Sequence, residues 1–384
     1  MKHTTEIHRI NELLKLNEEK SAFLDDSVSH NPVEHYYLAS IFEREQAAIF
    51  RQLPQPLVHS SELKEPGAFL RRTLAGFPLL ITRDADGHVH VFLNVCRHRG
   101  TRLVDEQSGC KHRFTCPYHA WTWDNRGELI GVPHQKLGFP DLDRAQHGLK
   151  RLGCSEFGGW LWVNPASEEA PDIPTFLQDY APDFSWFGGE SLQLLHVEEQ
   201  TREVNWKLLV EGGIEAYHFR VAHRNTIAPY FFDNLSSYES SGPHLRSILA
   251  KRSMADLRTQ AEADWQLRDH AQVVYTLFPT TQLLVQSDHI GWVHFEPLSA
   301  SSTRMRLCTL VPANRVETDK DLTHWAKNHA ITVKTLSEDF EIGESIQQGL
   351  RSGANEALNF GRFEGALAVF NQQISRSEEH TSEL

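Results

Sequence analysis

Two short segments each place a cysteine and a histidine close together. One residue separates Cys96 from His98, two residues separate Cys116 from His119, and seventeen lie between the pairs. Such side chains bind zinc, or a [2Fe–2S] cluster in which two cysteines hold one iron and two histidines the other. Zinc fingers usually pair cysteine with cysteine and then histidine with histidine. The mixed pairs therefore favour the cluster, with each loop reaching both irons.

A second pair of histidines lies at the end of a stretch that we expect to be helical, residues 204–221: His218 is within this stretch and His223 is just beyond it. Positions i and i+5 lie about 140° apart on an ideal helix, so both can bind one ion only if the helix distorts or ends between them. An Fe(II) site that activates O2 combines two histidines with one carboxylate and leaves positions open. The pair is a candidate for such a site if a carboxylate joins it.

Both segments resemble one known family. Residues 96–121, with two Cys–His pairs followed by Ala-Trp, resemble the Rieske domain of the Rieske non-haem iron oxygenases, the ring-hydroxylating oxygenase α-subunits. Residues 205–223 read Asn-Trp-Lys and then Glu-x3-Glu-Ala-Tyr-His-x4-His. They resemble the mononuclear-iron motif of the same family and follow the Rieske segment in the same order.

The resemblance implies two iron centres. The implied ligands of the Rieske [2Fe–2S] cluster are Cys96, His98, Cys116 and His119, and those of the mononuclear Fe(II) are His218, His223 and Asp339. Asp339 is one of four acids in the seven residues 338–344 of an expected C-terminal helix, where acids more often form a solvated face. Glu338 is the alternative third ligand.

Glu215, three residues before His218, has a separate role by resemblance. An acid at this position bonds an iron-ligand histidine and a cluster-ligand histidine of a neighbouring subunit, and so bridges the two centres. A carboxylate on the outer N–H of a ligand histidine fixes its tautomer and raises its basicity. A homotrimer closed head to tail is implied. The alternative is an acid on a helix surface.

The resemblance also implies a mono- or dioxygenase that uses O2 and receives electrons, ultimately from NAD(P)H, through a ferredoxin or reductase. We expect it to hydroxylate an aromatic compound. Candidate pocket residues are Phe219, Val221, Tyr230, Phe231, Phe232, Leu283, Val285, Trp292 and His294. Such a lining suits an aromatic ring. The same aromatic side chains could cage a quaternary ammonium compound, such as a betaine or carnitine, used by another branch of the family.

Other partners and functions fit parts of the sequence. Five basic residues around the cluster loops are candidates for docking an acidic ferredoxin: Arg97, Arg99, Arg102, Lys111 and Arg113. A Rieske electron carrier would have the cluster without iron at the second site. A structural or binding module would hold zinc at the two Cys–His pairs.

The composition of the 384-residue chain is that of a globular protein. Its net charge of −13, without a block of lysines or arginines, argues against nucleic acid as a partner. No apolar run is long enough to cross a bilayer, and the polar N-terminus lacks a signal-peptide core, so we expect a cytoplasmic protein. Cys110, Cys154 and Cys308 are expected to be free thiols.

The surrounding patterns predict an α+β protein. Helical periodicity marks residues 6–25, 32–50 and 322–350, and alternating strands around Asp86-Gly87, around residues 125–127 and at 159–164 mark a small all-β unit. A run at 192–205 and four runs over 273–312 predict antiparallel strands of a second unit. By resemblance this second sheet folds around a long helix, the helix-grip layout.

These elements predict a succession of domains. N-terminal helices over residues 1–44 are expected to pack on the catalytic domain. Residues 45–165 form the Rieske domain, and residues 166–375 form the catalytic mononuclear-iron domain. Residues 376–384 look like the translation of a sequencing-library adapter, so we expect a non-native, disordered tail.

Overall fold

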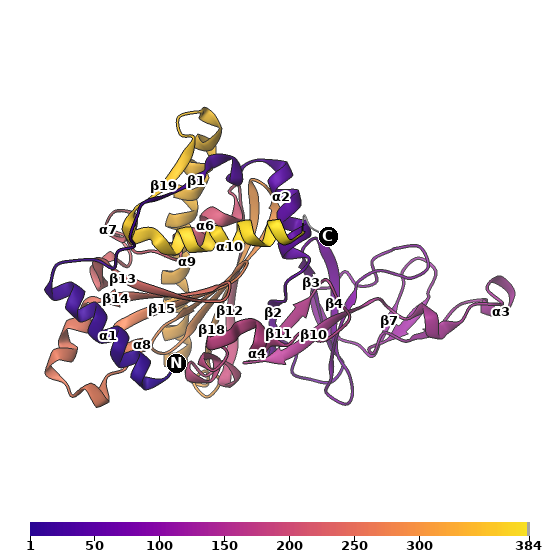
Figure 1. Cartoon of the computed structure of the whole chain (residues 1–384). Helices are drawn as coiled ribbons and strands as arrows, with labels where there is room; N and C mark the ends of the chain where they lie inside the picture. Colours follow the sequence, from indigo (N-terminus) through magenta and orange to yellow (C-terminus); the bar gives the residue numbers. More distant parts are fainter. Residues whose placement is uncertain (382–384) are drawn as a thin grey trace. The chain divides into compact units, whose positions relative to one another are not determined.

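A computed structural model describes residues 1–381 of the chain as two units (Figure 1). One unit is Phe50–Ile173; the other combines Met1–Ile49 with the chain from Pro174 onward. The expected Rieske domain of residues 45–165 thus corresponds to a unit that begins and ends a few residues later. The N-terminal segment belongs to the same unit as the second half of the chain.

The smaller unit is built from antiparallel strands. Its seven-stranded sheet has the order β2-β11-β10-β5-β4-β3-β6, and a three-stranded sheet has the order β7-β8-β9. The strands are β2 Gln55–His59, β3 Ala68–Leu74, β4 Phe77–Arg83, β5 Val89–Leu93, β6 Ser108–Cys110, β7 Arg113–Thr115, β8 Thr122–Asp124, β9 Leu129–Gly131, β10 Arg151–Phe157 and β11 Trp160–Asn164. A short helix of this unit is α3 Gln135–Gly138, whereas α4 Ile173–Leu177 begins at the last residue of this unit and continues into the larger one.

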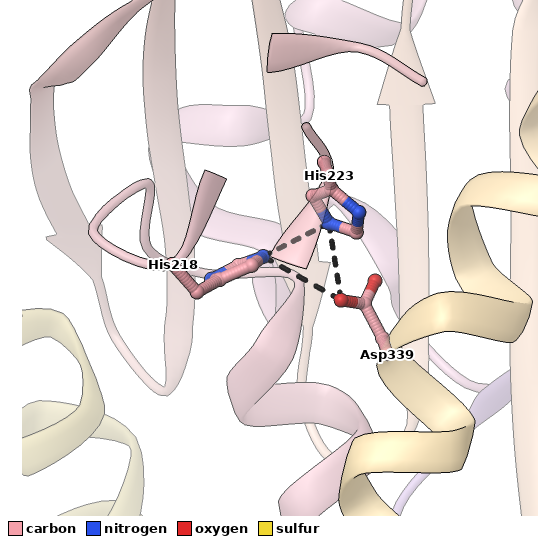
Figure 2. Close-up of side chains that lie close together, drawn as sticks. All are labelled: His218, His223 and Asp339. Carbon is pink, nitrogen blue, oxygen red and sulfur yellow. Dashed lines mark hydrogen bonds and ion pairs between the residues drawn. The ribbon is translucent and has the colours of Figure 1, made fainter. Parts of the chain in front are cut away.

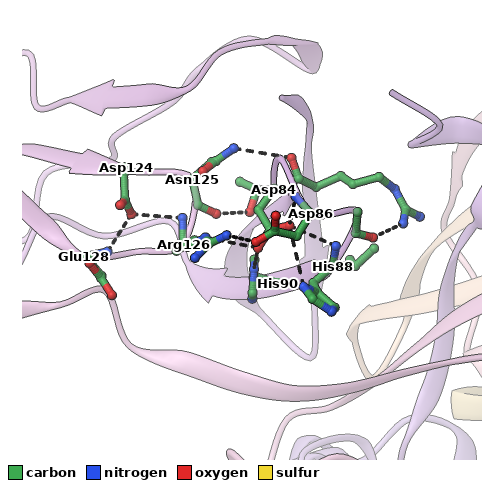
Figure 3. A network of polar contacts seen from close by, with 12 residues as sticks. Asp84, Asp86, His88, His90, Asp124, Asn125, Arg126 and Glu128 are labelled. Carbon is green, nitrogen blue, oxygen red and sulfur yellow. Dashed lines mark hydrogen bonds and ion pairs between the residues drawn. The ribbon is translucent and has the colours of Figure 1, made fainter. Parts of the chain in front are cut away.

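Two matching turns brace this unit (Figure 3). Asp84, just after β4, accepts hydrogen bonds from the backbone N–H groups two and four residues later, and Asp124, the last residue of β8, does the same. Arg126 from the second turn forms ion pairs with Asp84 and Asp86 of the first. Asp84 Oδ2 also lies 2.9 Å from Nε2 of His90, within hydrogen-bond distance. These contacts occupy both carboxylate oxygens of Asp84, so the network holds two turns together without needing an ion.

The larger unit contains a seven-stranded antiparallel sheet with the order β12-β18-β17-β16-β15-β14-β13. Its strands are β12 Leu192–Arg202, β13 Phe231–Ser241, β14 His244–Lys251, β15 Ala271–Leu277, β16 Thr281–Val285, β17 Ile290–Ser299 and β18 Ser302–Pro312. A separate pair joins β1, Ser29–Pro32, to β19, Ala357–Phe360. The helices are α1 His3–Glu18, α2 Ala39–Glu45, α5 Asp183–Trp186, α6 Trp206–Gly212, α7 Phe219–Ala222, α8 Leu267–His270, α9 Asp319–Gly349 and α10 Gly365–Thr381.

The long helix α9 packs against strands β12 and β18 and against helix α6 (Figure 1). Gly343 lets α9 lie close to the residues just before α6, because a Cβ at this position would lie only 3.3 Å from Val204 Cγ2. The side chain of Gln347, one turn further on, accepts a 2.8 Å hydrogen bond from the N–H of Asn205, the residue that caps α6. This sheet with its long helix confirms the predicted α+β class and helix-grip layout.

Two expectations about elements were wrong, and two strands were missed. The helix expected over residues 204–221 is two short helices, α6 and α7, separated by six residues. Strands β13 and β14 were not predicted. Residues 376–381 continue α10 instead of forming a disordered tail, and residues 382–384 lie outside the described part of the chain. Among the helices of the described residues, none combines the length and apolarity that a membrane span requires.

Candidate functional site

The structure brings His218, His223 and Asp339 together in the larger unit (Figure 2). The two Nε2 atoms lie 3.1 Å apart, and Asp339 Oδ1 lies 3.5 Å from that of His218 and 3.1 Å from that of His223. His223 is fully buried, whereas His218 and Asp339 are partly exposed. Two imidazoles and one carboxylate converging on one point are the donor set of a mononuclear Fe(II) site, so the residues present fit that ion.

The break between α6 and α7 lets both histidines face the same point. Gln282 of β16 donates a 2.8 Å hydrogen bond to the carbonyl of Val210 in the last turn of α6, which also accepts from the N–H of Gly213. It also fills the space beside Gly213, where a Cβ would lie 2.2 Å from Gln282 Oε1. Helix α7 is a single turn with His218 and His223 at its two ends.

A carboxylate holds the outer nitrogen of each histidine. Glu215 bonds Nδ1 of His218, and Glu338 Oε2 lies 2.8 Å from Nδ1 of His223. Thr226 donates a 2.6 Å hydrogen bond to the same oxygen of Glu338. An acceptor at Nδ1 favours the tautomer that turns the Nε2 lone pair inward, where a metal ligand needs it. Glu338, the alternative third ligand, therefore lies on the opposite side of His223 from Asp339.

Opposing effects set the charge of His223. Burial alone would lower its pKa, but the hydrogen bonds and negative charges of Asp339 and Glu338 outweigh burial and raise the pKa above its ordinary value. The acids therefore create a strongly negative pocket around the two imidazoles. Such a pocket attracts a cation, either a proton or a metal ion.

Two loops of the smaller unit carry the Cys–His pairs and repeat each other. In each loop the cysteine N–H donates a 2.8 Å hydrogen bond to the carbonyl of the residue five positions later. The cysteine carbonyl accepts a 3.0 Å hydrogen bond from the N–H of the residue four positions later. That later residue, Gly100 in one loop and Ala120 in the other, has a positive φ. Cys96 and Cys116 are both buried, and the rings of His98 and His119 lie 4.7 Å apart.

The four side chains fit a cluster with two cysteine and two histidine ligands. The Nδ1 atoms of His98 and His119 are buried and have no hydrogen-bond partner among residues 1–381. Buried polar atoms without partners are rare in folded proteins, and metal coordination would account for these two. Burial and the neighbouring charges of His119 and Arg99 lower the pKa of His98, which keeps this imidazole neutral and able to bind a metal.

A cavity of about 270 Å³ adjoins His223 and Asp339 on the sheet side of the larger unit. Three of the predicted pocket residues line it: Phe219, Tyr230 and Phe231. The prediction for β16 chose the wrong face of the strand. The even-numbered residues Gln282 and Leu284, with Gln286 just beyond the strand, line the cavity, and Leu283 and Val285 do not. Val221, Phe232, Trp292 and His294 do not appear in this lining, whereas Lys251, Gln272 and His289, which were not predicted, do.

A second cavity, of about 500 Å³, reaches Asp339 from another side and is lined by Glu215 and His218. Its remaining lining is mainly apolar and includes Leu208, Ile342 and Ile346. The candidate iron site therefore lies between two cavities.

The Asn-Trp-Lys start of the second motif has a structural role. Asn205 accepts a hydrogen bond from the N–H of Lys207 and so caps α6. Trp206 Nε1 donates 2.9 Å to Glu45, and Lys207 forms a fully buried ion pair with the same Glu45. The motif thereby ties α6 to the N-terminal segment.

The basic residues predicted to dock a ferredoxin are partly neutralised. Arg102 pairs with Asp105 and Lys111 with Glu106, while Arg99 lies over the ring of Tyr118. These exposed pairs leave a mixed surface around the loops. Ferredoxin docking stays a prediction.

Two family models match the chain. The Rieske [2Fe-2S] domain matches residues 54–143, and the catalytic domain of the ring-hydroxylating α-subunit matches residues 190–378. Together they contain all seven predicted ligands and Glu215. The resemblance noted from the motifs is confirmed.

Curated relatives include enzymes with different substrates. Chlorobenzene dioxygenase subunit alpha from Cupriavidus sp. is 30% identical over 207 residues, covering 52% of this chain and 45% of that protein. Carnitine monooxygenase oxygenase subunit from Acinetobacter baumannii is 27% identical over 328 residues, covering 84% and 85%. The chain spans about half the length of the first of these and of two other curated relatives.

A solved structure has the same fold. The quaternary ammonium Rieske monooxygenase in complex with an inhibitor matches with a TM-score of 0.78 at 24% identity, covering 91% of this chain and 96% of that one.

Proposed function

This chain belongs to the family of Rieske-type ring-hydroxylating oxygenase α-subunits, and from that premise we propose that it is an oxygenase that hydroxylates an aromatic compound. The observation that carries the proposal is the convergence of His218, His223 and Asp339 beside a cavity lined by Phe219 and Phe231. Aromatic side chains around a pocket that holds one ring suit an aromatic substrate.

In this proposal Cys96, His98, Cys116 and His119 hold the [2Fe–2S] cluster, and His218, His223 and Asp339 hold Fe(II). When bound, these groups supply one-electron transfer and the activation of O2. Glu215 and Glu338 keep the Nδ1 proton of their histidines in place, which directs both Nε2 lone pairs to one point. The cavity walls exclude water and orient the substrate.

We further propose a homotrimer in which Glu215 connects the iron site to the cluster of a neighbouring protomer. Glu215 and His218 line the larger cavity, beside the half-exposed Tyr217. Glu215 Oε2 accepts from the N–H groups of Tyr217 and His218, and Oε1 bonds His218 Nδ1, so a surface opening there would admit a cluster-ligand histidine of another protomer to the remaining lone pair of Oε1. Electrons would reach the cluster from a ferredoxin or reductase.

Oxidation of a quaternary ammonium compound is the second candidate. The carnitine monooxygenase subunit is similar over most of both chains, unlike the chlorobenzene dioxygenase subunit. Phe219, Tyr230 and Phe231 offer ring faces that attract a cation.

Substrate-dependent O2 consumption separates the candidates. The holoenzyme is supplied with a ferredoxin–reductase system and tested with aromatic acids, neutral aromatics, choline and betaines. Hydroxylated aromatic products support the first candidate, and an aldehyde with the released amine supports the second. If the protein transfers electrons but forms no O2-dependent product with any of these compounds, both oxygenase candidates are excluded and the protein is an electron carrier.

A further inference from the structure

The smaller of the two cavities at the iron site contains a lysine without a counter-ion. Lys251, the last residue of β14, lines the cavity together with His223 and Asp339. Within the described part of the chain, its ammonium group has no salt-bridge or hydrogen-bond partner. Partial burial lowers the pKa of Lys251, although Asp269 and Asp288 oppose this effect. Lys251 is only partly exposed, so its ammonium group has lost part of its hydration without gaining an anion, and a negatively charged ligand in the cavity would offset that loss.

The acids near Lys251 do not meet that demand. Asp288 has each carboxylate oxygen 2.8 Å from a histidine, His289 on one side and His324 on the other. Asp269 attracts Lys251 without forming an ion pair, and Arg268 repels it.

The cavity is polar at this end and apolar towards the iron ligands. Gln272, Gln286 and His289 line the polar end. Gln286 Nε2 donates 2.8 Å to Gln272 Oε1, which leaves the amide N–H groups of Gln272 available to another acceptor. Anion recognition commonly combines one cation with such neutral donors.

The apolar side connects Lys251 to the iron site. Phe231 pairs with Lys251 across β13 and β14. The ring of Phe231 lies 5.4 Å from that of Phe219, which lies 5.4 Å from the ring of His223. A molecule that contacts Lys251 and rests on the two phenylalanines therefore extends towards His223.

We propose that the substrate carries a carboxylate or sulfonate group, which binds Lys251 and the Gln272 amide while its carbon skeleton rests on Phe219 and Phe231. This inference rests on the proposed oxygenase function and names the substrate class of the same cavity. The anion fixes which carbon faces the iron site. A cation without an anionic group is rejected, because its charge would meet Lys251. A betaine is accepted only through its carboxylate.

Calorimetric titration of the anaerobic holoenzyme tests the proposal without requiring turnover. The probes are matched pairs that differ in the anion: benzoate with benzamide, glycine betaine with choline, and benzenesulfonate with benzenesulfonamide. The variants are Lys251→Met, Lys251→Arg and, as a control, Lys334→Met, which removes an exposed lysine of α9. Circular dichroism and iron content verify that each variant is folded and loaded.

At least one anionic probe should bind more tightly than its partner, and Lys251→Met should weaken it about tenfold or more, as loss of a hydrogen bond to a charged group does. Lys251→Arg should restore most of the affinity, and Lys334→Met should have no effect. The carboxylate and sulfonate arms show which anion is preferred. Preference for a neutral or cationic probe, binding by no anionic probe, or equal affinity in Lys251→Met would overturn the proposal. An enzyme that hydroxylates a neutral aromatic without binding the anions would refute this inference and leave the proposed function standing.

Discussion

Two adjacent acids of α9 differ in the atom of His223 that they face. Asp339 lies 3.1 Å from Nε2 and Glu338 lies 2.8 Å from Nδ1. Consecutive residues of a helix point about 100° apart, so one can reach into a site while its neighbour passes behind. The sequence left both acids as candidates because the position of His223 depends on tertiary contacts.

Substituting these acids should separate their effects on iron binding. Asp339→Ala removes a proposed ligand and should abolish retention of the mononuclear iron. Glu338→Ala removes only the partner of the outer nitrogen and should weaken iron binding about 10–100-fold. Titration of the apo-site with Fe(II) under anaerobic conditions measures both, and a greater loss in Glu338→Ala would reverse the assignment.

Glu211 should make stability depend on pH. Burial raises its pKa to about 7, although hydrogen bonds from Asn371 and Tyr36 oppose the shift. The folded state then binds more protons than the unfolded state between about pH 4.5, the ordinary glutamate value, and pH 7. Stability from this group is present below that window and is lost as the pH rises through it.

Denaturant unfolding at pH 5 and pH 7.5 tests this. Glu211→Gln keeps an oxygen that accepts from Tyr36 and Asn371, so it should gain stability relative to the wild type as the pH rises. Glu190→Gln, at an exposed position, is the control. A constant difference between wild type and Glu211→Gln at both pH values would show that Glu211 does not titrate in this window.

At the scale of elements, the break between α6 and α7 depends on one close contact. A Cβ at Gly213 would collide with Gln282, whereas a Cβ at Gly212 would have no atom within 4 Å. Gly213→Ala should therefore cost about 1–3 kcal/mol of unfolding free energy, as overpacking does. Because the shift would move His218, it should also reduce the retained mononuclear iron.

Gly212→Ala provides the matched comparison and should be neutral or slightly stabilising. Thermal unfolding and iron analysis of the two variants measure the effects. Equal stability of both variants would mean that the contact with Gln282 does not define the break.

Sequence patterns predicted the elements that are periodic and missed those that depend on tertiary contacts. Helix α9 and strands β15–β18 follow from periodicity. The end of α6 does not, because Gln282 comes from a distant strand. Strand β13 was missed because polar residues such as Asp233 and Asn234 interrupt its apolar alternation. The lining residues of β16 were assigned to the wrong face of the sheet. All five residues of this strand are buried, so both faces are covered, and an alternation of polar and apolar residues does not show which face lines the cavity.

The candidate ligands were named from sequence for a different reason. The spacing of the Cys–His pairs and the resemblance of both segments to the oxygenase family named them, and periodicity did not. The resemblance had also named Glu215 as the acid at the outer nitrogen of His218. The role of Glu338 at the outer nitrogen of His223 and the unpaired Lys251 have no such signature in the sequence. They became visible only once β14, α7 and α9 were placed around one cavity.

For the whole molecule, the proposal requires electrons to pass between protomers through Glu215. Glu215→Gln should leave both iron centres loaded and the trimer intact, but slow oxidation of the reduced cluster at least tenfold, because the bridge loses its charge. Stopped-flow absorbance of the cluster with O2 and substrate measures the rate. Glu341→Gln, at an exposed position of α9, is the control. An unchanged rate in Glu215→Gln would remove the bridge.

The most direct test is the iron content of His218→Ala together with its turnover. The wild type should contain about three irons per chain, two in the cluster and one at the mononuclear site. The variant should retain about two irons and an unchanged cluster spectrum, and should form no product. A variant that keeps the third iron, or that still hydroxylates substrate, would contradict the assignment of His218, His223 and Asp339 as the site of O2 chemistry.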